Sequence, residues 1–594
     1  MRDFLRGYLA DRPADISGLA SKSLEVVAQP LSTGSNSPSV PWLLRPPVLA
    51  GTAAPVGAEL PGIKWDHLPQ PDDSSLGMQI SNPGEPGQGG ALTSKRVQAF
   101  SGSVQVSEHS TQTQANDSYL NVRDKQGATF EIEPEPLATG GEKVVFLTRD
   151  KQHVVAFFFG HVNDPGERRR RIEKILGAYN PTIGGVQADY WRKHFCWPVG
   201  IVDNDDALPA EFIKRHNLFK PVLGVVVPAY RSNFFFKDRT GNTREKKGRW
   251  FTGAKSRKLV PEDERGTLLS YLQCCSVMAS AVRRLHFAGL AHSDLSHSNV
   301  LIDPKNGDAC LIDCDSLVVP GFAPPTVMGT PGYIAPEVVA GKKQPSIETD
   351  QHALAVLIYE SLLLRHPLAG PKVRSTRSPE EDDSLSMGEK AIYVEHPLDA
   401  SNHLRPAPEI PVSSLGPYLE NLFIKTFVTG LHAPHLRASA SEWEKGLQKT
   451  LDLIHPSPDR KNWFVLAKGM PFECSFTKQK WNEPVPSCNL YRKMDGEEFV
   501  NEDYSITVWT GKYLYDWHFF TNATPLNSSR KPLAYFAVQN GKCYLVNQSE
   551  ADMWLPDSSE RVAHGKGGVI QQGLKVLLSE EEGGRLAIFD ILTP

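Results

Sequence analysis

The chain has 594 residues, more than a single hydrophobic core usually holds, so we expect more than one domain. Its 64 Lys and Arg residues nearly balance its 68 Asp and Glu residues, which argues against general binding to nucleic acid or to a membrane surface. The eight cysteines form no C-x-x-C pair, and no run of about 18 apolar residues occurs, so we expect a cytoplasmic protein without disulfides, signal sequence or transmembrane helix.

Residues 1–119 are predicted to be largely disordered. From Leu31 to Asp117 this region is rich in Ser, Pro, Gly, Thr and Gln and shows no sustained hydrophobic period. Such a composition buries too little apolar surface to offset the chain entropy that is lost on folding.

Residues 120–455 are predicted to form an α+β domain. Two strand patterns, at 144–148 and 153–159, come first, and a helical pattern at 168–179 follows them. A further apolar strand precedes a long helix at 268–287, and more helical segments continue to the end of this region. The pattern indicates a small sheet followed by a larger helical body, which makes two lobes.

Residues 460–594 are predicted to form a separate β-sandwich. Short segments of period two recur here, among them SITVWT, AYFAV, CYLVN and RLAIFDI. Asn, Gly and Asp separate these segments, as turn residues do between antiparallel strands.

Four motifs, in a fixed order, point to the chemistry of the chain. The first, HSDLSHSN from His292 to Asn299, follows the long helix and leads into a strand. Fourteen residues after Asn299 another strand ends at Asp313; then come GTPGYIAPE, which ends at Glu337, and Asp350 at the start of an apolar helix. Together they resemble the signature set of protein kinases, and the resemblance covers more than half of the chain.

The resemblance implies an enzyme that transfers a phosphoryl group from ATP, held with Mg²⁺, to a serine or threonine of a protein substrate. It makes Asp294 the base or hydroxyl-orienting group, and Asn299 and Asp313 the metal ligands. The alternative is that Asp294 and Asn299 only form a turn between helix and strand.

Two structural contacts are implied as well. Glu337 is expected to form an ion pair with Arg437, which matches the late helical arginine of the family. Asp350 is expected to brace the turn at His292.

The chain departs from the family where the phosphates of ATP should be held. Phe158 stands where the strand lysine belongs, and the glycine loop reads Gly140-Gly141-Glu142-Lys143, with a lysine at the position of its third glycine. Kinases of the with-no-lysine family are similar in both respects. We therefore predict that Lys143 supplies the missing cation and that Gly140 and Gly141 help to bind the nucleotide.

Lys143 is further expected to pair with a carboxylate of the helix at 168–179, with Glu173 as first choice and Glu167 as second. The alternative is that Lys143 is an exposed turn lysine and the domain is a pseudokinase, a scaffold that binds nucleotide or partner proteins without phosphoryl transfer. The retained metal ligands favour the enzyme.

Other departures predict a slow enzyme. Ser293 replaces the arginine beside the base, Ser296 replaces the loop lysine, and Cys314 and Asp315 replace Phe-Gly. Two basic segments are expected to be solvated: the arginine run 168–171 as a helix face, and the insert 237–258, with nine basic and two acidic residues, as a mobile loop.

Several segments are similar to one group of bacterial kinases, among them WPVGIV, GLAHSDLSHSNVLID, LIDCDSLVVPG, GTPGYIAPEV and YVEHPLDASN. These are cytoplasmic Ser/Thr kinases encoded in tellurite-resistance loci beside a von Willebrand-type protein and a metal-dependent phosphatase. The resemblance implies bacterial stress signalling, with those two proteins as partners.

The C-terminal region weakly resembles a forkhead-associated domain, which reads phosphothreonine. The spacing of TVWT-Gly511-Lys512, AYFAVQNGKCYLVN and RLAIFDI carries this likeness. Lys512 stands where that family has an arginine, and Pro532 where it has a histidine. A docking module without a phosphate site is therefore favoured over a phosphopeptide reader.

Overall fold

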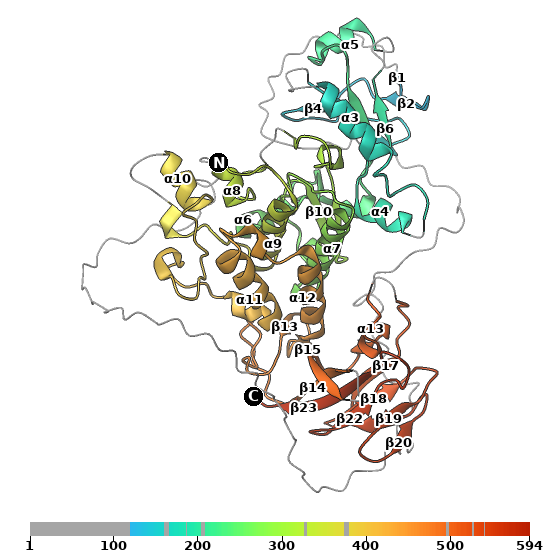
Figure 1. The fold of residues 1–594 in the computed structure, drawn as a ribbon, viewed down its shortest axis with the longest axis vertical. Helices are drawn as coiled ribbons and strands as arrows, with labels where there is room; N and C mark the ends of the chain where they lie inside the picture. The colour runs from blue at the N-terminus through green and yellow to red at the C-terminus, as the bar shows by residue number, and fades with distance from the viewer. Residues whose placement is uncertain are drawn as a thin grey trace, which may run out of the picture.

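The computed structural model describes residues 119–594, apart from 160–164, 186, 204–207, 326–328, 374–378, 495–497, 526–527 and 540. The predicted disorder of the N-terminal region lies outside the described residues. The fold contains both helices and sheets, as predicted, and Figure 1 shows a sheet-containing lobe, a helical body and a second sheet-rich region in chain order. None of the described helices is long and apolar enough to cross a membrane.

The first lobe is built on a five-stranded antiparallel sheet with the strand order β3-β4-β5-β7-β6. Its strands are β3 (Ala138–Thr139), β4 (Lys143–Leu147), β5 (His153–Phe158), β7 (Gly224–Pro228) and β6 (Gly200–Val202). The hairpin β1 (Leu120–Arg123) and β2 (Thr129–Ile132) precedes it, and the helices of this lobe are α3 (Pro165–Leu176), α4 (Ala188–His194) and α5 (Ala210–Arg215).

The helical body is organised around two long buried helices, α7 (Leu268–Phe287) and α9 (Ile347–Leu363). Each begins with a capping box, which satisfies backbone N–H groups that the first helical turn leaves without partners. The remaining helices are α6 (Ala254–Leu259), α8 (Pro336–Val339), α10 (Pro379–Ser386), α11 (Pro417–Ile424) and α12 (Ala440–Asp452). One hydrophobic core runs through this body and includes buried residues of α7, α9, α11 and α12.

Three short hairpins complete the body, and one of them holds the candidate site. That hairpin is β10 (Val300–Asp303) with β11 (Asp308–Leu311), fully buried, with the motif His292–Asn299 directly before it and Asp313 directly after it. The others are β8 (Phe235–Lys237) with β9 (Thr243–Glu245), and β12 (Ile454–Pro456) with β13 (Trp463–Val465).

The expectation of two solvated basic segments is wrong for several of their residues. Arg168 and Arg171 of α3 are buried. The insert 237–258 contains β9, and its Lys246 is buried between Glu264 and Asp303, with both Nζ–O distances at 2.6 Å. Buried cations are tolerated where carboxylates pair with them, and the sequence pattern does not reveal such partners.

The C-terminal region contains two antiparallel sheets. The six-stranded sheet has the order β15-β14-β23-β22-β19-β20 and the four-stranded sheet the order β16-β17-β18-β21. Buried residues of both sheets, including Leu490, Ile506, Phe536 and Phe589, share one core. The strands are β14 (Val485–Lys493), β15 (Phe499–Thr507), β16 (Tyr513–Leu514), β17 (Ala534–Gln539), β18 (Lys542–Asn547), β19 (Met553–Leu555), β20 (Glu560–Val562), β21 (Gly567–Val569), β22 (Lys575–Leu577) and β23 (Arg585–Leu592), with the short helix α13 (Asp516–Phe519) after β16.

A buried carboxylate at the end of α12 joins this region to the helical body. Asp452 accepts from Lys512 Nζ at 2.7 Å and from the Tyr504 hydroxyl at 2.6 Å, and His518 Nε2 lies 3.2 Å from its second oxygen. Although burial acts to raise the pKa of Asp452, Lys512 and His518 outweigh it and hold the pKa below its ordinary value. Lys512 stands where a forkhead-associated domain has its phosphothreonine-binding arginine. Here its ammonium is engaged by Asp452 of the helical body.

Replacement of Lys512 by Met should lower the free energy of unfolding by about 3–5 kcal/mol, because it leaves the Asp452 carboxylate buried without its cation. Urea denaturation followed by tryptophan fluorescence measures this loss. The matched control is Lys531→Met, whose exposed pair with Glu550 should contribute less than about 1 kcal/mol. Equal stability of the two variants would show that the junction does not depend on this pair.

Candidate active site

The turn between α7 and β10 is held from two sides. The His292 N–H donates to Asp350 Oδ2 at 2.6 Å, which confirms the predicted brace from α9. The His292 ring donates through Nε2 to the carbonyl oxygen of Ile312 at 2.8 Å. This second bond ties the turn to the segment that carries Asp313.

Asp294, the predicted base, has both carboxylate oxygens fixed. Asn299 Nδ2 donates to its Oδ2 at 2.8 Å and to its backbone oxygen at 2.9 Å. The backbone N–H and the hydroxyl of Thr330 donate to Oδ1 at 2.6 and 2.7 Å. Burial raises the pKa of Asp294, and the bonds from Thr330 oppose that rise.

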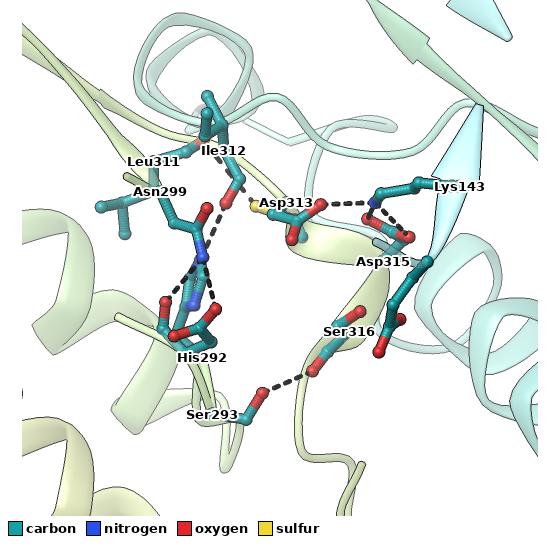
Figure 2. A network of polar contacts seen from close by, with 12 residues as sticks. Lys143, His292, Ser293, Asn299, Leu311, Ile312, Asp313, Asp315 and Ser316 are labelled. Carbon is teal, nitrogen blue, oxygen red and sulfur yellow. Dashed lines mark hydrogen bonds and ion pairs between the residues drawn. The ribbon is translucent and has the colours of Figure 1, made fainter. Parts of the chain in front are cut away.

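Lys143 and Asp313 meet across the two lobes, as Figure 2 shows. Lys143 begins β4, and its Nζ contacts Asp313 Oδ1 and both carboxylate oxygens of Asp315, the latter at 3.0 and 2.9 Å. Burial acts to raise the pKa of Asp313, but Lys143 outweighs it and lowers that pKa to about 2. Asp313 is therefore ionised at neutral pH.

The sheet register places Lys143 directly opposite Phe158. Opposite residues of antiparallel strands lie about 5 Å apart, so a lysine at either position starts from nearly the same place. The Phe158 ring lies 5.6 Å from Lys143 Nζ and 4.5 Å from the Arg168 guanidinium. Arg168 in turn binds Glu142 Oε2 at 3.0 and 3.1 Å.

The predicted pair between Lys143 and Glu173 is wrong. Glu173 binds Lys125, with an O–N distance of 2.6 Å, and the second choice, Glu167, accepts from the backbone N–H of Ala323 at 3.0 Å. Glu173 follows Arg168 by five residues, which rotates it about 140° around the helix axis. The helix thus presents Arg168, a cation, to Phe158.

Gly140 and Gly141 lie in the turn between β3 and β4. The Gly140 N–H donates to the Lys143 carbonyl oxygen at 2.9 Å, which closes this turn. A side chain at Gly141 would meet no atom within 4 Å, so the backbone there is open to a ligand. Their part in nucleotide binding stays a prediction.

The ion pair predicted between Glu337 and Arg437 is confirmed. Two parallel N–O contacts of 2.7 Å join the side chains. Arg437, which is buried, also donates to the carbonyl oxygens of Gly430, Leu431 and Glu348 at 2.9 Å. This network fixes α8 to the late part of the helical body.

Several site residues escaped the sequence analysis: Asp315, Thr330, Arg168 and Glu142. A usable signal existed for Asp315, because a carboxylate replaces a glycine two residues after a metal ligand. The other three residues act through contacts between segments that are distant in sequence, and a sequence pattern does not predict such contacts.

The residues present fit Mg²⁺ and a polyphosphate. Mg²⁺ prefers hard oxygen ligands and is usually bound by one or two side chains together with substrate phosphates. Asp313 offers an ionised carboxylate, and Asn299, with its Nδ2 turned to Asp294, keeps its amide oxygen for a cation. Within the described parts of the chain, no group of three or more His, Cys, Asp or Glu side chains could hold a metal ion without such phosphates.

Residues 252–415 match the family model of the protein kinase domain. Serine/threonine-protein kinase PknD of Chlamydia muridarum (strain MoPn / Nigg) is 27% identical over 252 residues, or 37% of this chain and 25% of that protein. Atypical protein kinase C of Drosophila melanogaster is 36% identical over 123 residues, 20% of each protein. Probable serine/threonine-protein kinase CCRP1 of Zea mays is 36% identical over 111 residues, 18% of this chain and 17% of that protein.

The chain spans a quarter or less of the length of these relatives. A solved structure, the Toxoplasma gondii specific rhoptry antigen kinase domain, matches with a TM-score of 0.34 and 13% identity over 57% of this chain and 87% of that chain, a likeness too weak to support a conclusion. By these sequence matches, the chain contains a protein kinase domain similar to those of serine/threonine kinases.

Replacement of Phe158 by Lys should destabilise the fold by about 3 kcal/mol or more, because a second buried ammonium would lie beside Arg168 and Lys143. Thermal and urea unfolding measure the loss. Phe158→Leu is the control, since it keeps an apolar side chain and should cost less. A Phe158→Lys variant as stable as Phe158→Leu would contradict the described placement of the two cations.

Proposed function

We propose that residues 120–455 form an ATP- and Mg²⁺-dependent protein serine/threonine kinase domain in which Lys143 takes the part of the absent strand lysine. The observation that carries this proposal is the contact of Lys143 with Asp313, two residues 170 positions apart in sequence. A lysine that reaches the expected metal ligand also lies within reach of phosphates bound to that metal. The register of Lys143 against Phe158 supports the same conclusion.

Each site residue then has a distinct role in phosphoryl transfer. Asp294, fixed by Thr330 and Asn299, orients the hydroxyl of the substrate serine or threonine and accepts its proton. Asn299 and Asp313 hold Mg²⁺, which when bound neutralises phosphate charge. Lys143 binds phosphate oxygens, Gly141 leaves its backbone open to them, and Gly140 closes the turn that presents Gly141.

We further propose that this kinase acts in the bacterial cytoplasm in a stress-signalling module, with a phosphatase and a von Willebrand-type protein as partners. The segments that resemble kinases of tellurite-resistance loci support this assignment. Residues 460–594 would be a β-sandwich that serves as a docking module, because its Lys512 is engaged by Asp452 of the kinase body.

The second candidate is a pseudokinase scaffold. One observation favours it: the ammonium of Lys143 neutralises Asp313, so the same lysine competes with a metal ion for that carboxylate. A scaffold of this kind would bind nucleotide or partner proteins and transfer nothing.

Replacement of Lys143 by Met should reduce phosphoryl transfer about 100-fold or more, as losses of a preorganised charge typically do. The measurement is incorporation of labelled phosphate from Mg²⁺-ATP into the protein itself and into a generic basic substrate. Lys125→Met is the matched control, because it removes an exposed lysine of the same lobe that binds Glu173. Transfer by Lys143→Met at the wild-type rate would refute the relocated lysine, and absence of transfer from the wild type would favour the scaffold.

A further inference from the structure

The two carboxylates that share the Lys143 ammonium differ in their access to ligands. The Asp313 side chain is 33% exposed, whereas that of Asp315 is 2% exposed. Both oxygens of Asp315 contact Nζ, while Asp313 contributes one. Asp313 is therefore open to a metal ion, and Asp315 is the inner, buried partner of the lysine. Figure 2 shows the contacts of both carboxylates with the ammonium.

Helix α3 offers no carboxylate to Lys143. Its two acidic residues, Glu167 and Glu173, contact the Ala323 backbone N–H and Lys125. Its Arg168 faces Phe158 and binds Glu142. In kinases with a strand lysine, a helix glutamate pairs with that lysine, but in the described residues of α3 that partner is absent.

Charge balance explains why two carboxylates are needed. Before ligands bind, one ammonium is shared by two carboxylates. When Asp313 turns to a divalent cation, Lys143 loses one contact. Asp315 is then the remaining carboxylate at the ammonium, beside the Phe158 ring, and its burial among protein atoms prevents water from replacing it.

We propose that Asp315 is the positioning residue of Lys143, which holds the ammonium toward the phosphates during turnover in place of a helix carboxylate. This inference rests on the proposed function of the site. Asp315 lies in the 3-10 turn Cys314–Ser316, which directly follows Asp313. One short segment thus carries both the metal ligand and the carboxylate that positions the lysine, and the placement of the lysine does not depend on an ion pair with α3.

The test is a double-mutant cycle of Asp315→Asn and Lys143→Met. Asp315→Asn keeps the shape of the side chain and removes its charge, and should lower kcat about 10- to 100-fold, as loss of an outer-shell partner typically does. If Asp315 acts through Lys143, the same change in the Lys143→Met background should alter the remaining rate less than about twofold. An equal loss in both backgrounds would show that Asp315 acts independently, and would overturn the proposal.

Glu173→Gln distinguishes the two possible anchors. If Asp315 holds the lysine, the rate of Glu173→Gln should stay within about twofold of the wild-type rate, because Glu173 contacts Lys125. A loss as large as that of Asp315→Asn would show that Glu173 of α3 positions Lys143. Circular dichroism and thermal melting check the fold of each variant, and Asp315→Gly, which restores the residue typical of the family, replaces Asp315→Asn if the latter does not fold.

Nucleotide binding separates this proposal from the proposed function. If the wild type transfers no phosphate, the kinase assignment fails. The same cycle is then measured through the Kd for trinitrophenyl-ATP in the presence of Mg²⁺. Weaker binding in Asp315→Asn, without further weakening in the Lys143→Met background, would support the positioning role. Equal weakening in both backgrounds, or no binding by the wild type, would overturn it.

Discussion

The ammonium of Lys143 between the carboxylates of Asp313 and Asp315 is the interaction on which the candidate site depends. Two carboxylates so close together would repel each other, and at least one would be protonated without a cation between them. Lys143 removes that conflict and joins strand β4 of the sheet-containing lobe to the segment after β11 in the helical body. The site and the connection between the lobes are therefore stabilised by the same contact.

The residues around this contact place a second cation, Arg168, beside Phe158 and pair it with a carboxylate. Phe158 stands where the sequence resemblance predicts a strand lysine, and Arg168 of α3 covers its ring. Glu142, the neighbour of Lys143, neutralises this arginine. Phe158 thus lies beside a cation of the helix, and a lysine introduced at this position alone would lie next to both Arg168 and Lys143.

The sequence predicted those contacts correctly whose two residues both belong to recognisable motifs. The brace from Asp350 to the turn at His292 and the pair of Glu337 with Arg437 were predicted and are present, because motif order fixes which elements carry them. The structure also places Lys143 and Phe158, which the sequence singled out, opposite each other on neighbouring strands. That Lys143 takes over the phosphate contact stays a prediction.

The failures have a common physical cause. Glu173 and Lys246 were judged by residue type and local pattern, and each has a partner that only the tertiary structure brings close. A run of charged residues in a sequence indicates solvent unless burial and a counter-charge are known. The choice of Asp315 over Glu173 as partner of Lys143 depends on the rotation of one helix face, which periodicity alone does not fix.

The site is proposed to transfer phosphate with Asp313 as a metal ligand. Autophosphorylation of the full chain with Mg²⁺-ATP, wild type beside Asp313→Ala, with and without EDTA, tests it most directly. We predict incorporation by the wild type that EDTA abolishes, and a loss of about 100-fold or more in Asp313→Ala. Equal incorporation by the two proteins, or incorporation by the wild type that survives removal of Mg²⁺, would contradict it.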